Sequence, residues 1–146
     1  LHVFPNGANV IPKKTVFTVD IRSGKEEHIQ NVIKKLNRLI ASYSKDGIHI
    51  SAIQQLYMKP KKMNQEIVSL LKQTSNELDI DYFPINSGAG HDAMVLADVT
   101  DVGMIFIPSK DGLSHCPEEW SDSRDIAKAV DILFQTAKKL TEVEKK

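Results

Sequence analysis

The hydrophobic pattern of this chain changes period several times, and this alternation limits the folds that it can adopt. Residues 15–22, TVFTVDIR, alternate between apolar and polar side chains, which is typical of a strand with one buried face. Residues 26–43 repeat apolar side chains at the spacing of an amphipathic helix, and Gly47 follows as a stop signal. Residues 48–58 alternate again and end before Pro60, which predicts strand, helix, strand with the helix packed on the strand's apolar face.

The second half of the chain alternates in a similar way. Apolar spacing predicts a helix over about 63–78, and DYFPI predicts a short strand after it. The nearly continuous apolar run of residues 102–109 is typical of a strand buried on both faces, in a sheet covered by helices. These patterns predict an α/β fold. The last helix, from about Ser121, is expected to turn these residues inward: Ile126, Val130, Leu133, Phe134, Ala137 and Leu140.

A charged run with a proline, KPKK at residues 59–62, separates the two halves. Such a run suits a crossing between two substructures, although a solvated surface turn has the same composition. We place a boundary there and expect one segment over residues 1–60 and a second over residues 61–146.

Charge and cysteine content exclude several classes of partner. The 19 basic and 19 acidic residues cancel and form no basic stripe with interleaved aromatics, so neither nucleic acid nor a membrane surface is expected. The single cysteine, Cys116, has no partner for an internal disulfide, and no apolar run approaches the roughly 20 residues of a membrane helix. We therefore expect a cytoplasmic protein.

Two glycine-containing loops, SGAGHDA at residues 87–93 and GLSHCPEEW at residues 112–120, follow predicted strands. In open α/β sheets, ligands bind beyond the carboxyl ends of strands, and small residues let the backbone approach a ligand closely. His115 beside a carboxylate suits a metal ligand, but catalytic zinc takes three protein ligands and no close ligand spacing occurs. From spacing alone, both loops can equally be ordinary polar turns, and in the first of them Asp92 would cap the helix that follows. Nucleotide binding is not expected, since SGAG lacks the lysine and hydroxyl of a P-loop and the spacing of a dinucleotide-binding motif.

Five blocks occur in order along the chain: NGANVIP, FTVDIR, SGAGHDA, GMIFIPS and GLSHCPEEW. In this order they resemble the C-terminal part of the N-carbamoyl-L-amino acid hydrolases, a group of two-metal amidohydrolases that also contains allantoate amidohydrolases and β-ureidopropionases. The resemblance extends from about Phe4 to Leu133. Because the chain starts with Leu1 instead of methionine, we expect a fragment of a longer protein, although an engineered start would look the same.

The resemblance implies a catalytic domain with helices around a mixed sheet, interrupted by a lid and dimerisation domain of antiparallel strands with helices on one side. Residues 1–60 then correspond to the second part of this α+β lid, and residues 61–146 to the C-terminal part of the α/β catalytic domain. A homodimer through the lid is implied. Two zinc or manganese ions are implied for the full-length protein, with an incomplete metal site in these residues.

The resemblance also assigns roles to residues of the two loops. His115 matches the last metal ligand of the family, and Cys116 departs from the serine that often follows that ligand. Gly90, together with Ala89 and His91 on weaker grounds, matches the loop that lines the substrate pocket.

Asn9 and Arg22 match lid residues that contact the substrate, typically in the active site of the partner subunit. The polar face of the predicted strand carries Arg22, whose planar guanidinium matches a substrate carboxylate bidentately. An ion pair with Asp20 explains the same position without a ligand.

The reaction implied is metal-assisted hydrolysis of a ureido carbonyl, which releases ammonia and carbon dioxide. The general base and the other metal ligands are expected before Leu1, so these residues alone are expected to be inactive. Two alternatives remain: an aminopeptidase or aminoacylase relative with the same architecture, and a non-catalytic module that binds an anion or pairs with itself.

Overall fold

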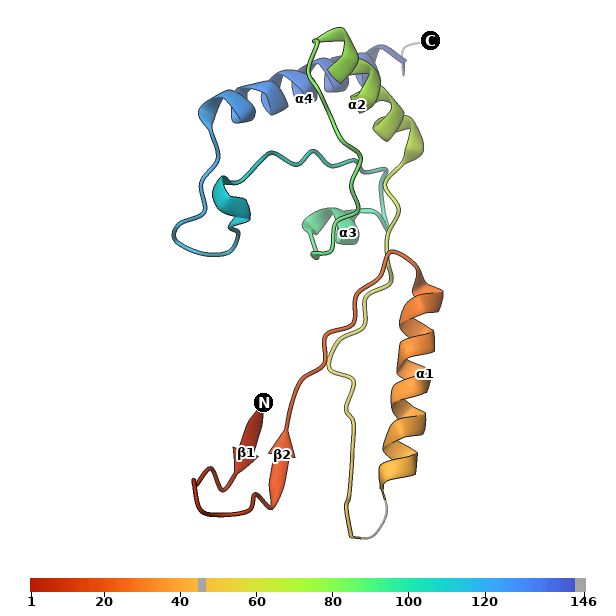
Figure 1. The fold of residues 1–146 in the computed structure, drawn as a ribbon. Coiled ribbons are helices and arrows are strands. Elements are labelled where there is room, and N and C mark those ends of the chain that lie inside the picture. The colour runs from red at the N-terminus through yellow and green to blue at the C-terminus, as the bar shows by residue number, and fades with distance from the viewer. Residues whose placement is uncertain (45–46, 144–146) are drawn as a thin grey trace. The chain divides into compact units, whose positions relative to one another are not determined.

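A computed structural model describes residues 1–44 and 47–143, and its contacts divide the chain into two compact units, Leu1–Pro60 and Lys61–Lys146 (Figure 1). In the first unit, residues 1–44 and 47–60 contain two short strands and one helix: β1 (His2–Phe4), β2 (Lys14–Val16) and α1 (Glu26–Tyr43). In the second unit, the described residues 61–143 contain three α-helices and one 3₁₀ turn: α2 (Gln65–Glu77), α3 (Asp92–Leu96), η1 (Lys110–Gly112) and α4 (Ser123–Val143). The division falls within the KPKK run. What the two units correspond to in a longer protein stays a prediction.

The strands of the first unit form a two-stranded antiparallel sheet in which Val3 is opposite Thr15. Pairing ends at Val16, opposite His2. The strand predicted over residues 15–22 is therefore wrong from residue 17 onward. A strand needs a neighbouring ladder to satisfy its backbone groups, and the described residues supply none for 17–22 or for the predicted strand at 48–58.

Helix α1 has the bounds that its apolar spacing predicts. Ile29 is buried, and the other inward positions follow it at helical spacing: Ile33, Leu36 and Ile40. The helix does not cover the predicted apolar face of the first strand, because Phe17 and Val19 are 63% and 53% exposed. The chain that returns after α1 packs on it instead.

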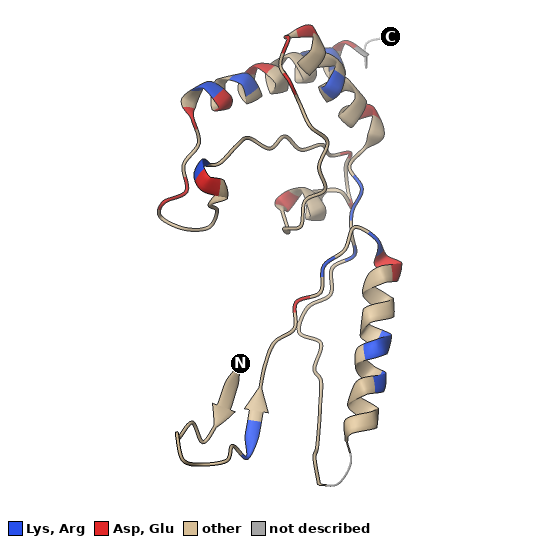
Figure 2. Ribbon diagram, in the orientation of Figure 1, with Lys and Arg blue, Asp and Glu red and all other residues tan. Residues whose placement is uncertain are grey.

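Tyr57 ties this returning chain to the first turn of α1. Its hydroxyl donates to Oε1 of Glu26 at 2.8 Å and accepts from Nε2 of Gln30 at 2.8 Å. The Tyr57 hydroxyl, followed by nearby Lys59, holds the pKa of Glu26 below its usual value. Glu26 also lies at the acidic start of α1, where the helix dipole favours an anion (Figure 2).

Helices α2 and α4 pack on each other and form the core of the second unit. Thr74 and Ser75 of α2 and Ile132 and Thr136 of α4 are buried. Nζ of Lys139 lies 3.3 Å from Oγ1 of Thr74 and also pairs with the last residue of α2.

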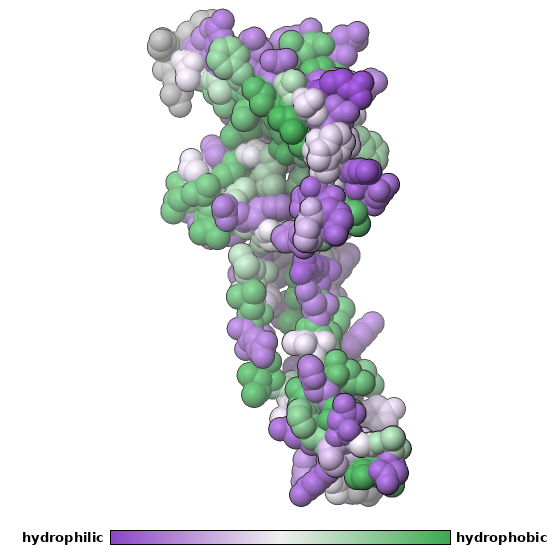
Figure 3. Space-filling model, turned by 90° about the vertical axis from the view of Figure 1, so that its left-hand side faces the viewer, coloured by the Kyte–Doolittle hydropathy of each residue, from purple (hydrophilic) through white to green (hydrophobic). Residues whose placement is uncertain are grey.

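The helix predicted from about Ser121 is confirmed as α4, which begins at Ser123. The prediction of which side of this helix is buried is wrong for the described residues. Helix α2 packs on the side that carries Ile132 and Thr136, and no described element covers the opposite side. Figure 3 shows hydrophobic side chains, in green, on the visible surface of both units. The exposed residues of α4 include all six that the pattern turned inward: Ile126, Val130, Leu133, Phe134, Ala137 and Leu140.

Residues 102–109 lie between α3 and η1 and form an extended segment without a strand partner among the described residues. The Asn64 N–H donates to the Val102 carbonyl at 2.9 Å. A Cβ added to Gly103 would stand 2.4 Å from Cγ2 of Ile67, so the segment approaches α2 closely. The predicted mixed sheet is therefore absent from the described residues, because neither this segment nor residues 81–85 finds a ladder. The chain combines helices with one small sheet.

Among the residues with a described structure, no helix combines the length and the apolarity needed to cross a membrane.

Candidate substrate-binding and metal-binding residues

The glycine loop before α3 is closed by hydrogen bonds of Ser87. Its Oγ lies 2.8 Å from Nε2 of His91, accepts the Ala89 N–H at 3.2 Å and lies 3.1 Å from the Ala89 carbonyl oxygen. The His91 ring meets Phe106 edge-on, with ring centroids 5.5 Å apart. The loop is thus linked both to itself and to the segment over residues 102–109.

The structure corrects one alternative for this loop. His91 occupies the N-cap position of α3 in an extended conformation, and Asp92 is the first helical residue, so Asp92 does not act as the cap. A Cβ on Gly90 would meet nothing within 4 Å, so packing within the described structure does not require a glycine there. Gly90 and Ala89 are both exposed.

The second loop holds His115 in the left-handed backbone region, at a φ of 60°. This conformation is uncommon for a residue other than glycine and requires support from its surroundings. Oε2 of Glu119 accepts the His115 N–H at 2.8 Å, and the Glu119 N–H donates to the Cys116 carbonyl at 3.1 Å. The Lys110 N–H donates to the Trp120 carbonyl at 2.8 Å and joins the two ends of the loop. His115 itself is exposed.

The described residues supply one candidate metal ligand and do not complete a metal site. No group of three histidine, cysteine, aspartate or glutamate side chains within them lies close enough to hold an ion. His115 projects from a turn, its neighbour Cys116 is half-buried, and the Glu119 carboxylate is already engaged by the backbone. A metal that binds His115 would need further ligands from elsewhere.

Arg22 makes a bidentate ion pair with Asp20. Nε of Arg22 lies 3.0 Å from Oδ1, and Nη2 lies 2.7 Å from Oδ2. The hydrogen bond from Arg22 lowers the pKa of Asp20, although both side chains are well exposed. The ion pair with Asp20, which is the alternative to substrate binding for Arg22, is therefore present in the structure. Such a surface pair adds little stability.

Asn9, the other predicted lid residue, is exposed in a turn closed by the Val10 N–H and the Gly7 carbonyl at 3.3 Å. It belongs to the first unit, as Arg22 does, whereas His91 and His115 belong to the second. The role of each stays a prediction.

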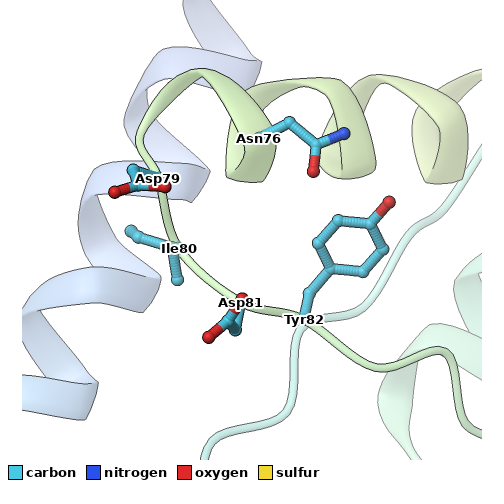
Figure 4. A pocket seen from close by; sticks show the side chains of 5 residues that line it. All are labelled: Asn76, Asp79, Ile80, Asp81 and Tyr82. Atoms are coloured by element: carbon cyan, nitrogen blue, oxygen red, sulfur yellow. The ribbon is translucent and has the colours of Figure 1, made fainter.

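An open depression of about 330 Å³ lies where the chain leaves α2, and none of the predicted site residues lines it. Figure 4 shows the Tyr82 ring beneath Asn76, while the carboxylates of Asp79 and Asp81 point to the other side of the chain. In the sequence, the local signal for this depression is the Asp-rich turn at residues 79–81. In the structure, Asp79 of this turn adopts a φ of 53°.

Comparison with known proteins identifies the class of this chain. Its residues 2–139 match the peptidase family M20/M25/M40, and the chain belongs to this family. It is 37% identical over 134 residues to an N-carbamoyl-L-amino-acid amidohydrolase from Pseudomonas sp. (strain NS671), which covers 91% of this chain and 32% of that protein. It is also 37% identical over 134 residues to an allantoate amidohydrolase from Escherichia coli (strain K12), covering 88% of this chain and 32% of that protein.

A ureidoglycolate hydrolase from Oryza sativa subsp. japonica is 31% identical over 135 residues, which cover 91% of this chain and 28% of that protein. The chain thus spans about a third of the length of the curated relatives that it matches. The resemblance to the N-carbamoyl-L-amino acid hydrolase group is confirmed.

Proposed function

We propose that this chain is the C-terminal part of a metal-dependent amidohydrolase that hydrolyses the carbamoyl group of N-carbamoyl-L-amino acids or related ureido acids, with release of ammonia and carbon dioxide. The observation that carries the proposal is the family match over residues 2–139, a range that contains both candidate loops. The 37% identity to an N-carbamoyl-L-amino-acid amidohydrolase supports the reaction class.

His115 is proposed as a ligand of one ion of a zinc or manganese pair. The turn around it supports this role, because the bond from Glu119 holds the left-handed backbone of His115 at a set place in the loop. The other ligands and the general base are proposed to lie outside the described residues, since these bring no three candidate ligands together. These residues alone are therefore proposed to be inactive.

Substrate contacts are proposed for residues of both units, with Asn9 and Arg22 of the first unit acting in the active site of the partner subunit. The Arg22 guanidinium suits the substrate carboxylate because its planar fork donates two parallel hydrogen bonds, as it already does to Asp20. Asn9 is proposed to assist it. Gly90 leaves open space in which a ligand can approach its backbone, with Ala89 and His91 beside it.

The first unit is proposed to be part of a lid that forms a homodimer, with the second unit in the catalytic domain. This division is supported by two observations. Residues 1–60 form a compact unit of their own, and their described part contains one helix and one antiparallel sheet. The cytoplasm is proposed as the location. Sedimentation of the natural full-length protein as a monomer at tens of micromolar would contradict the dimer.

The decisive experiment is an assay of the natural full-length protein with N-carbamoyl-L-amino acids in the presence of Mn²⁺ or Zn²⁺, with ammonia as the measured product. We expect turnover, and we expect His115→Ala to abolish it. His49→Ala is the matched control, because His49 is an exposed histidine outside both loops. Full activity of the His115→Ala protein would refute the proposal.

Allantoate is the second candidate substrate, because the identity to the E. coli allantoate amidohydrolase is equally high at 37%. Parallel assays with allantoate and with simple dipeptides separate the ureido reading from an aminopeptidase reading. Turnover of dipeptides alone would favour the peptidase alternative, and tight anion binding without turnover of any substrate would favour a non-catalytic module.

A further inference from the structure

Ser87 and His91 form a side-chain pair for which neither the sequence pattern nor the family comparison gives a reason. Oγ of Ser87 lies 2.8 Å from Nε2 of His91, and the same oxygen has two contacts with Ala89. The ring of His91 is also held edge-on against Phe106. The imidazole therefore has a defined orientation in an otherwise exposed loop.

Counting protons decides which nitrogen of His91 carries hydrogen. The Ala89 N–H donates to Oγ of Ser87, and the serine hydroxyl has one proton for its two remaining contacts. If the hydroxyl donates to the Ala89 carbonyl, Nε2 of His91 must be protonated and donate to Oγ, and all three contacts become hydrogen bonds. If the hydroxyl donates to Nε2, the 3.1 Å contact with the carbonyl lacks a proton. The first arrangement satisfies more groups.

We propose that Ser87 is a positioning residue that holds His91 in the Nε2–H tautomer and leaves Nδ1 as an acceptor for an N–H group of the ligand. Within the described residues, Nδ1 has no hydrogen-bond partner. A ureido group carries N–H donors, whereas a carboxylate has only acceptors, so His91 in this tautomer selects the ureido end of a substrate. The substrate class rests on the proposed function, and the tautomer does not.

The ring nitrogens can be observed directly by ¹⁵N NMR of the natural full-length protein labelled at histidine, with His91→Gln to assign the signals. We expect His91 to be protonated on Nε2 alone when neutral. We expect Ser87→Ala to give averaged shifts of two exchanging tautomers and Ser87→Thr to restore the single one. Ser69→Ala, which removes an exposed serine of α2, is the control. A proton on Nδ1 in the wild type, or unchanged shifts in Ser87→Ala, would overturn the proposal.

Kinetics test the link to the ureido group. Ser87→Ala is expected to raise KM for an N-carbamoyl-L-amino acid about three- to tenfold with little change in kcat, as the loss of one oriented neutral hydrogen bond predicts. The inhibition constant of a simple aliphatic monocarboxylate, which has no N–H group, is expected to stay unchanged. An equal effect on both would show that Ser87 acts on the loop as a whole. If the wild type hydrolyses no ureido acid, the proposed function fails, while the NMR result still decides the role of Ser87.

Discussion

The backbone N–H of His115 donates a 2.8 Å hydrogen bond to Oε2 of Glu119, and this bond closes the turn that carries the proposed metal ligand. The φ of His115 is 60°, a region that side chains disfavour, so the turn depends on such support. Glu119 thus holds the backbone of the proposed metal ligand, His115, in place.

Replacing Glu119 with alanine is expected to lower both kcat/KM and the metal retained after dialysis by about tenfold, because a charge-assisted hydrogen bond is lost. Glu119→Gln should keep most of both, since an amide oxygen accepts the same N–H. Glu118→Ala, at the exposed neighbouring position, is the control. Equal losses in Glu119→Ala and Glu118→Ala would contradict the bracing role. Kinetics and metal analysis of the full-length proteins provide the measurements.

Arg22 and Asp20 offer a test of whether the guanidinium serves a substrate or an ion pair. Under the proposed function, Arg22→Ala should reduce kcat/KM for an N-carbamoyl amino acid about 10- to 100-fold, because bidentate pairing with the carboxylate is lost. Asp20→Asn should have a small effect, since the pair is exposed and adds little stability. Similar losses in the two variants would indicate that the ion pair is the main role of Arg22.

Acid should destabilise the protein through carboxylates that are hydrogen-bonded in the folded state. Side-chain and backbone hydrogen bonds from Arg124 lower the pKa of Asp122 from 3.8 to about 2. Because the folded pKa is lowered, this stabilisation is complete above the unfolded value and is lost as pH falls from about 4 to about 2.

Urea unfolding followed by circular dichroism between pH 2 and pH 5 measures this loss. Asp122→Asn should show a flatter pH dependence than the wild type, because its side chain does not titrate. Asp131→Asn, at an exposed position of α4, should leave the slope unchanged. Identical slopes in the wild type and Asp122→Asn would show that other groups carry the acid sensitivity.

Gly103 should be intolerant of a side chain because its backbone lies against α2. An alanine Cβ would stand 2.4 Å from Cγ2 of Ile67, and overpacking of this kind costs about 1–3 kcal/mol. Thermal unfolding should show a lower Tm for Gly103→Ala, and this loss should be smaller when Gly103→Ala is introduced into an Ile67→Ala background. Gly88→Ala serves as the control, since its Cβ would meet nothing within 4 Å. An equal loss of Tm in the wild-type and Ile67→Ala backgrounds would contradict the close approach.

The helices were predictable from the sequence because each is held by hydrogen bonds between residues four apart. The spacing of apolar residues predicted α1 over Glu26–Tyr43, and it predicted α2 and α4 to within two residues at their starts. The candidate loops were also recognisable from the sequence, because the order of glycine, proline and histidine in each block is characteristic of the family. Recognising that order requires no knowledge of the contacts that these residues make.

Pairing, burial and backbone conformation were decided only by the tertiary structure. Residues 17–22, 48–58 and 102–109 have the composition of strands, but a strand exists only where a second chain segment completes its ladder. The apolar pattern of α4 does not say which side α2 covers, and the structure buries Ile132 while Leu133 stays exposed. The contact of Ser87 with His91 and the left-handed turn at His115 likewise depend on how the chain folds back on itself, which residue types alone do not encode.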